Sequence, residues 1–206
     1  MADRVEGAVS PEQQVRDFTR SCVRAGLLTD EQLRAEVREA ITVELPDRAA
    51  SAEALAREWV DEARERLVGE QEGWPEATDY DRLQTAFSEL ETLDVAVMQG
   101  VEDHWSAKAE LTRLDSAGRL PRGVAWFTAP DVWHAVDEGM LEVNVWHGTT
   151  ANVAQGDDLL DAVLTVFDKH GIPAHFDEGR IEVAAQWQKR IARHVEPDDS
   201  SGDPTR

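Results

Sequence analysis

The stretch GVAWFTAPDVWHAVDEGMLEVNVWH, residues 123–147, decides the fold class. It begins with an apolar run, 123–128, that is typical of a buried strand. Pro130 then opens a short helix, and Gly139 ends it. In residues 141–146, Leu141, Val143 and Val145 alternate with Glu142, Asn144 and Trp146, and this period of two is typical of a second strand. The stretch therefore predicts a strand, a helix and a strand within an α/β domain.

The sequence on both sides extends this unit. Upstream, the apolar run 95–98 predicts a strand and residues 103–115 predict a helix. Downstream, Asp157 caps another helix, residues 174–183 form a tight hairpin, and a last short helix holds Trp187. We expect one mixed sheet of about five strands, with βαβ crossovers, a final antiparallel hairpin and helices packed on it.

The N-terminal third predicts helices only. The first helix begins after Ser10 and ends at Gly26. The second begins at a capping box on Thr29 and ends before Pro46. The third begins at Ser51 and has apolar residues at helical spacing. The fold class is therefore α+β, with a helical N-terminal region followed by an α/β sandwich.

These patterns divide the chain into four parts. Residues 1–9 are expected to be a flexible N-terminus, and residues 10–75 form the helical region, which ends at the break Trp74–Pro75. The α/β domain occupies residues 76–195. Residues 196–206 are polar and are expected to form a disordered acidic tail.

The charge of the chain is strongly negative. It carries 42 acidic and 21 basic residues, a formal net charge of −21. Such a charge repels phosphate backbones and anionic lipids, so we expect no direct nucleic-acid binding and no membrane binding. A basic protein partner would be attracted, although the same charge also serves solubility alone. The oligomeric state stays open.

The sequence also predicts the compartment. The N-terminus lacks the positive segment and apolar run of a secretory signal, and no stretch approaches the ~20 apolar residues of a membrane helix. Cys22 is the only cysteine, so an intramolecular disulfide is excluded. We therefore expect a globular protein in the cytoplasm.

Two histidines are candidates for ligand binding. His147 is the stronger one, because it ends a strand and precedes a loose segment, where sites on α/β sheets usually lie. His104 follows Glu102 and Asp103, and carboxylates beside an imidazole can tune a general base or bind metal. An ordinary loop residue and an exposed helix start are the alternatives. Because the sequence supplies no set of three or four ligands, we predict neither a metal nor a cofactor.

Two tryptophans are further candidates. The chain has seven tryptophans and one tyrosine. Trp146 falls on the polar side of its strand, and Trp133 lies on the preceding helix. They would act as aromatic anchors for a peptide or ligand if they are exposed. Alternatively, helices cover both faces of the sheet and bury Trp146.

Three stretches lie at the boundaries of helices and strands: residues 124–127, residues 135–141, and residues 180–183 with 187–190. Together they resemble an uncharacterised family of domains of unknown function that is common in actinobacteria, over about Tyr80 to Arg190. The resemblance implies an α/β fold, and because the family has no established activity it indicates no mechanism.

No motif of a known enzyme class is present. The sequence has no nucleophile elbow, phosphate-binding loop or dinucleotide fingerprint, so the catalytic residues stay unknown and an enzyme is disfavoured. The favoured function is a non-enzymatic interaction or regulatory protein that docks on a basic partner. The alternatives are a low-motif enzyme or ligand-binding domain with a pocket near His147, and a small-molecule site between the two halves.

Overall fold

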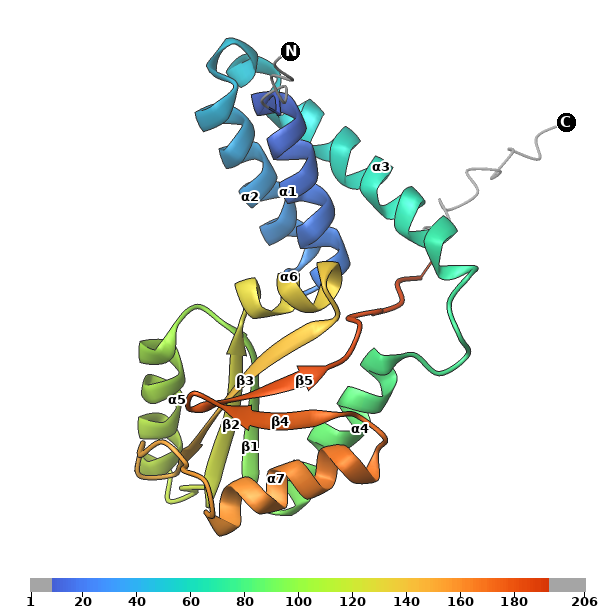
Figure 1. Cartoon of the computed structure of the whole chain (residues 1–206). Coiled ribbons are helices and arrows are strands. Elements are labelled where there is room, and N and C mark those ends of the chain that lie inside the picture. Colours follow the sequence, from blue (N-terminus) through green and yellow to red (C-terminus); the bar gives the residue numbers. More distant parts are fainter. Residues whose placement is uncertain (1–8, 193–206) are drawn as a thin grey trace, which may run out of the picture.

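The computed structural model describes residues 9–192 and consists of a helical bundle above an α/β unit (Figure 1). The predicted flexible N-terminus, except Val9, and the predicted acidic tail lie outside the described residues. The bundle contains α1 (Pro11–Ala25), α2 (Asp30–Glu44) and α3 (Ala52–Gln71), with a short 3-10 helix, Pro46–Ser51, before α3.

Local signals explain where the bundle helices begin and end. The Ser10 hydroxyl accepts a hydrogen bond from the Gln13 backbone N–H, which caps α1. Gly26 ends α1 in the left-handed conformation, with φ of 59°, which glycine adopts without a steric cost. Thr29 and Gln32 form the predicted capping box of α2. The apolar stripes of the three helices meet in a core of their own around Trp59.

The α/β unit contains the strands β1 (Val95–Val101), β2 (Gly123–Thr128), β3 (Met140–His147), β4 (Ala174–Asp177) and β5 (Arg180–Ala184). They form one mixed sheet in the order β1-β2-β3-β5-β4. Strands β1 and β2 are parallel, and the other neighbouring pairs are antiparallel. The sheet agrees with the predicted fold class.

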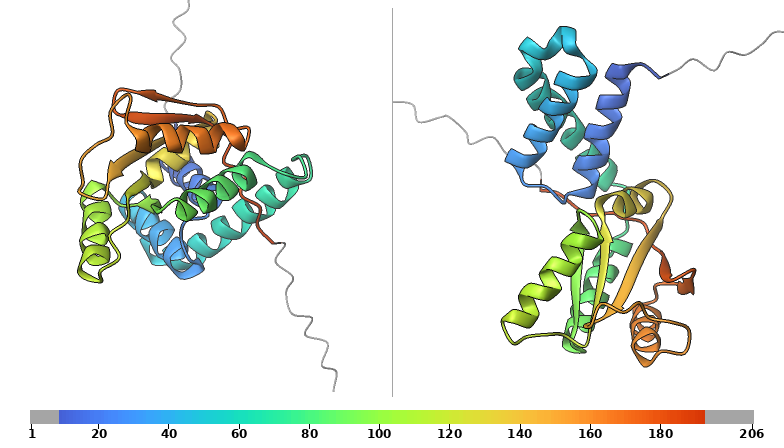
Figure 2. Two further views of the ribbon diagram at one scale, coloured as in Figure 1. Left: turned by 90° about the horizontal axis from the view of Figure 1, so that it is seen from below. Right: turned by 90° about the vertical axis from the view of Figure 1, so that its left-hand side faces the viewer.

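Helices pack on both faces of the sheet (Figures 1 and 2). The larger core contains Phe87, Phe127 and Phe167 from three different elements. Helices α4 (Asp79–Thr92) and α7 (Asp158–Lys169) cover the face that holds this larger core. A smaller core lies on the other face, which α5 (His104–Ser116) covers and where Trp126 packs under α5.

The connection between β2 and β3 differs from the predicted parallel crossover. Helix α6 (Ala129–Asp137) has nine residues and lies at the end of the sheet, beneath the bundle (Figure 1). A parallel crossover needs about a dozen residues or more to return along the sheet. The shorter α6 instead turns the chain round, and β3 runs antiparallel to β2.

The predicted last helix at Trp187 is wrong. Residues 185–190 run without helical structure from β5 up to the bundle. The backbone N–H of Trp187 donates to the Ala135 carbonyl, and its indole Nε1–H donates to the Ala25 carbonyl at 3.0 Å. Lys189 Nζ also donates to the Gly26 carbonyl, at 2.6 Å. These tertiary hydrogen bonds replace those of a helix and tie the C-terminal segment to the bundle.

Helix α6 makes the second connection between the halves. Trp133 packs edge-on against Phe18 of α1, with ring centroids 6.1 Å apart. It contacts both the core of the bundle and the larger core of the sheet. None of the helices in residues 9–192 is long and apolar enough to cross a membrane.

Candidate functional site

His147 forms a pair with Asp157. It ends β3, and its Nε2 lies 3.2 Å from Asp157 Oδ2 at the start of α7. Asp157 also accepts a hydrogen bond from the backbone N–H of Ala154. That bond and, to a smaller extent, the His147 ring lower the pKa of the Asp157 carboxyl. The pair holds the loop 148–156 against the start of α7.

His104 lies at the other end of the sheet. It is the first residue of α5, soon after Val101, which pairs with Thr128 at the end of β2. His147 pairs with Gly123 at the start of β2. The length of β2 therefore separates the two histidines. The structure does not bring them into one site.

Trp146 and Trp133 have separate roles in packing. Trp146 lies on the face of α5, as its position in the strand predicts, and packs on Trp126 with ring centroids 4.7 Å apart. Trp133 is partly buried between the bundle and the sheet. Neither is a freely exposed anchor. Among residues 9–192, no group of three or more His, Cys, Asp or Glu side chains is placed to hold a metal ion.

The first candidate site is a groove between α1 and α2, which we call the acidic groove. It encloses about 420 Å³. Phe18, Ala40 and Val43 contribute its apolar surface, and Val43 is 66% exposed. The remaining lining residues are Gln14, Val15, Glu36, Glu39 and Glu44.

The carboxylates of the acidic groove are free of ion pairs. Glu36, Glu39 and Glu44 are exposed, and none of them pairs with a cation in the described part of the chain. The charge of one of them, Glu36, also acts on Cys22. Burial and then the charge of Glu36 raise the pKa of this thiol to about 12.

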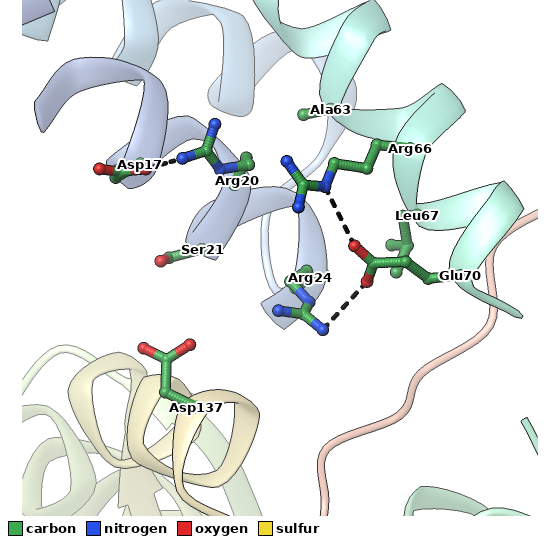
Figure 3. Close-up of a pocket in the computed structure, with 9 residues that line it drawn as sticks. All are labelled: Asp17, Arg20, Ser21, Arg24, Ala63, Arg66, Leu67, Glu70 and Asp137. Carbon is green, nitrogen blue, oxygen red and sulfur yellow. Dashed lines mark hydrogen bonds and ion pairs between the residues drawn. The ribbon is translucent and has the colours of Figure 1, made fainter. Parts of the chain in front are cut away.

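The second candidate site is a cavity of about 240 Å³ between α1, α3 and α6, which we call the arginine cavity (Figure 3). Arg20 and Arg24 reach it from α1, and Arg66 from α3. Glu70 accepts from Arg24 at 3.0 Å and from Arg66 at 3.2 Å. Asp137 lines the opposite side from α6.

A smaller hollow of about 130 Å³ continues the arginine cavity along α1 and α3, with Arg20 and Arg66 lining both. Arg16 lies over the Trp59 ring there, 4.4 Å from its centroid, and also pairs with Glu62. The buried Trp59 Nε1–H has no hydrogen-bond partner among the described residues. The two hollows gather four guanidinium groups in a strongly acidic protein.

Sequence reasoning missed both sites, although signals for them exist. Arg16, Arg20 and Arg24 are four residues apart and lie on one face of α1. In α2, the acidic and apolar lining residues fall at spacings of three, four and seven. What the spacing does not reveal is the element that faces each stripe.

Comparison with known proteins places the chain in a family. A family model described as a domain of unknown function, DUF6891, matches residues 9–191. The chain belongs to the DUF6891 family. Searches of the curated proteins and of the solved structures found no match.

The DUF6891 match begins earlier than the resemblance in the sequence indicated. It includes α1 to α3 as well as the sheet, whereas the resemblance began only at about Tyr80. Both candidate sites are lined by residues within the match. The helical bundle is therefore part of the DUF6891 unit.

Proposed function

We propose that this DUF6891 protein is a non-enzymatic interaction module that binds a basic amphipathic helix of a partner protein in the acidic groove. The observation that carries the proposal is the combination of an apolar floor with three exposed, unpaired glutamates at its rim. An amphipathic helix with lysine or arginine beside its apolar face matches both properties.

The floor of the groove supplies the contact area. Val43 is largely exposed, and Phe18 and Ala40 are partly buried at the seam of α1 and α2. A partner that covers these side chains removes apolar surface from water, at about 25 cal/mol per Å² before the costs of association. Leucine or isoleucine side chains at helical spacing would fit along the seam.

The rim supplies selectivity for charge. Glu36 and Glu39 lie one turn apart on α2, and Glu44 extends the rim toward the end of that helix. Exposed ion pairs each contribute about 0.2–1 kcal/mol, so three of them add a modest amount to affinity. The net charge of −21 adds long-range attraction of a basic partner and a faster encounter at low salt.

The enzyme alternative has less support in the geometry. His147 is engaged by Asp157 at the edge of a loop, and His104 lies at the opposite end of the sheet. A general base needs a reacting group within reach, and His104, the other titratable candidate from the sequence, does not lie beside His147.

The proposal is tested with a synthetic amphipathic helix of leucine and lysine, labelled for fluorescence anisotropy. The variant Glu36→Gln/Glu39→Gln/Glu44→Gln should bind it about threefold to a hundredfold more weakly than the wild type, because three charge contacts of about 0.2–1 kcal/mol each are lost. The control variant Glu58→Gln/Asp61→Asn/Glu65→Gln makes the same change in net charge on exposed positions of α3. It should bind nearly as the wild type does.

A second variant tests whether the helix binds in the groove itself or is held only by the overall negative charge of the protein. Val43→Asn, which leaves the net charge unchanged, should weaken binding by placing a polar group in the apolar floor, while a leucine and glutamate helix should not bind the wild type. Equal weakening in the two triple variants would contradict the proposal, and so would the absence of binding by the wild type at low salt.

A further inference from the structure

The arginine cavity has more positive than negative charge on one side. Arg24 and Arg66 share a single carboxylate, Glu70, which leaves one of the two guanidinium charges uncompensated by that contact. Arg20 is paired with its neighbour Asp17 on the same helix. The shared carboxylate leaves donors of Arg24 and Arg66 available, because each guanidinium carries five N–H groups.

The opposite side of the cavity has a free negative charge. Asp137 is exposed at the end of α6, and its carboxylate points toward the cavity (Figure 3). Among the described residues it forms no ion pair. The cavity therefore offers cationic donors from the bundle and an anionic acceptor from the α/β unit.

We propose that the arginine cavity binds a small zwitterion of the amino-acid class. Its carboxylate binds Arg24 and Arg66, and its ammonium group binds Asp137. Arginine recognises a carboxylate through two parallel hydrogen bonds, and a carboxylate is the usual partner of an ammonium group. The volume of about 240 Å³ is smaller than that of a typical drug-sized pocket, so the ligand is small.

Binding would connect the two halves of the molecule. Arg24 and Arg66 belong to the bundle, whereas Asp137 belongs to α6 of the α/β unit. A ligand that contacts both sides stabilises their native arrangement by mass action. This site is independent of the acidic groove, which uses the other side of α1 toward α2, so either proposal can fail alone.

The test is isothermal calorimetry and thermal unfolding of the full chain with individual free L-amino acids. Acetate, inorganic phosphate and ethylammonium serve as probes that carry only one of the two charges. At least one amino acid should bind and raise the melting temperature more than acetate, phosphate or ethylammonium does at equal concentration.

Two matched pairs of variants assign the contacts. Asp137→Asn and Arg66→Gln should each weaken binding of that amino acid at least about tenfold. The controls Glu138→Gln on the α6 side and Arg57→Gln on α3 change exposed residues outside the cavity and should leave binding unchanged. Unfolding without ligand shows whether each variant is folded.

Three results would overturn the proposal. They are the failure of every amino acid to bind, equal binding by wild type and a folded Asp137→Asn variant, and binding of phosphate alone that depends on Arg66 and not on Asp137. The last result would identify the cavity as a site for simple anions.

Discussion

At the scale of single residues, Cys22 shows how burial and one charge control a reactive group. Its side chain is 6% exposed in the bundle, and burial and Glu36 raise its pKa to about 12. The thiolate is the reactive form, so the native thiol should not react with a disulfide reagent at about pH 8. The reagent should label it fully in denaturing urea. Fast labelling of the native protein would contradict this prediction.

The same shift has a consequence for stability. A pKa raised from 9.0 to about 12 means that the folded state retains the proton longer than the unfolded state. The contribution of the protonated Cys22 thiol to the free energy of unfolding is therefore complete below about pH 9 and is lost progressively as the pH rises toward about 12. Urea unfolding of the wild type and Cys22→Ala across this range should show the difference between them shrink with rising pH.

At the scale of elements, the caps decide where helices begin. Thr78 and Asp81 form the capping box of α4, in which the Thr78 N–H donates to the Asp81 carboxylate at 2.8 Å. That hydrogen bond is the main cause of the lowered pKa of Asp81. The stabilisation that the ionised Asp81 carboxylate gives the folded state is present above the usual aspartate pKa. It is lost as the pH falls through the lowered pKa of Asp81.

The capping boxes of α4 and α2 allow a matched test. Thr78 is completely buried, whereas Thr29 in the box of α2 is exposed. Thr78→Ala should lower the free energy of unfolding by about 1–2 kcal/mol, and more than Thr29→Ala does, since buried polar groups then lose their partner. Thr78→Ser should restore most of the loss. Chemical denaturation measures all three, and equal losses at the two threonines would contradict the prediction.

At the scale of the whole molecule, the bundle and the α/β unit are joined by Trp133 and by the C-terminal segment with Trp187. Trp133 contacts the core of the bundle and the larger core of the sheet. Trp187 is 4% exposed, and its indole N–H donates a hydrogen bond to the Ala25 carbonyl. Because each half loses packing when the other unfolds, we expect one cooperative unfolding transition.

Substitution of the two tryptophans tests this coupling. Trp187→Phe should reduce stability by about 1–3 kcal/mol, because the buried Ala25 carbonyl loses its donor. Trp133→Ala should cost less than the about 3–5 kcal/mol of a fully buried tryptophan, because Trp133 is only partly buried, and should separate the transitions seen by circular dichroism and fluorescence. Trp105→Ala, at a side chain that is 62% exposed, is the control and should change little. Separate transitions in the wild type would refute the coupling.

The sequence by itself determined most of the helices and strands of this protein, the segment at Trp187 excepted. Ser10, Thr29 and Gly26 act through hydrogen bonds and backbone angles within a few residues, so the helix ends could be predicted locally. The alternation in residues 141–146 likewise predicted which side of β3 faces the larger core. The mixed sheet followed from the order of these elements.

The tertiary structure alone decided the antiparallel return of β3, the extended path at Trp187 and both candidate sites. Each depends on contacts between segments far apart in the chain, such as Trp187 with Ala25 or Arg24 with Glu70. Asp137 gave no signal as a site residue, because its place opposite the arginines depends on how α6 packs beneath the bundle. Periodicity identifies a face of a helix, whereas only packing selects the neighbour that meets it.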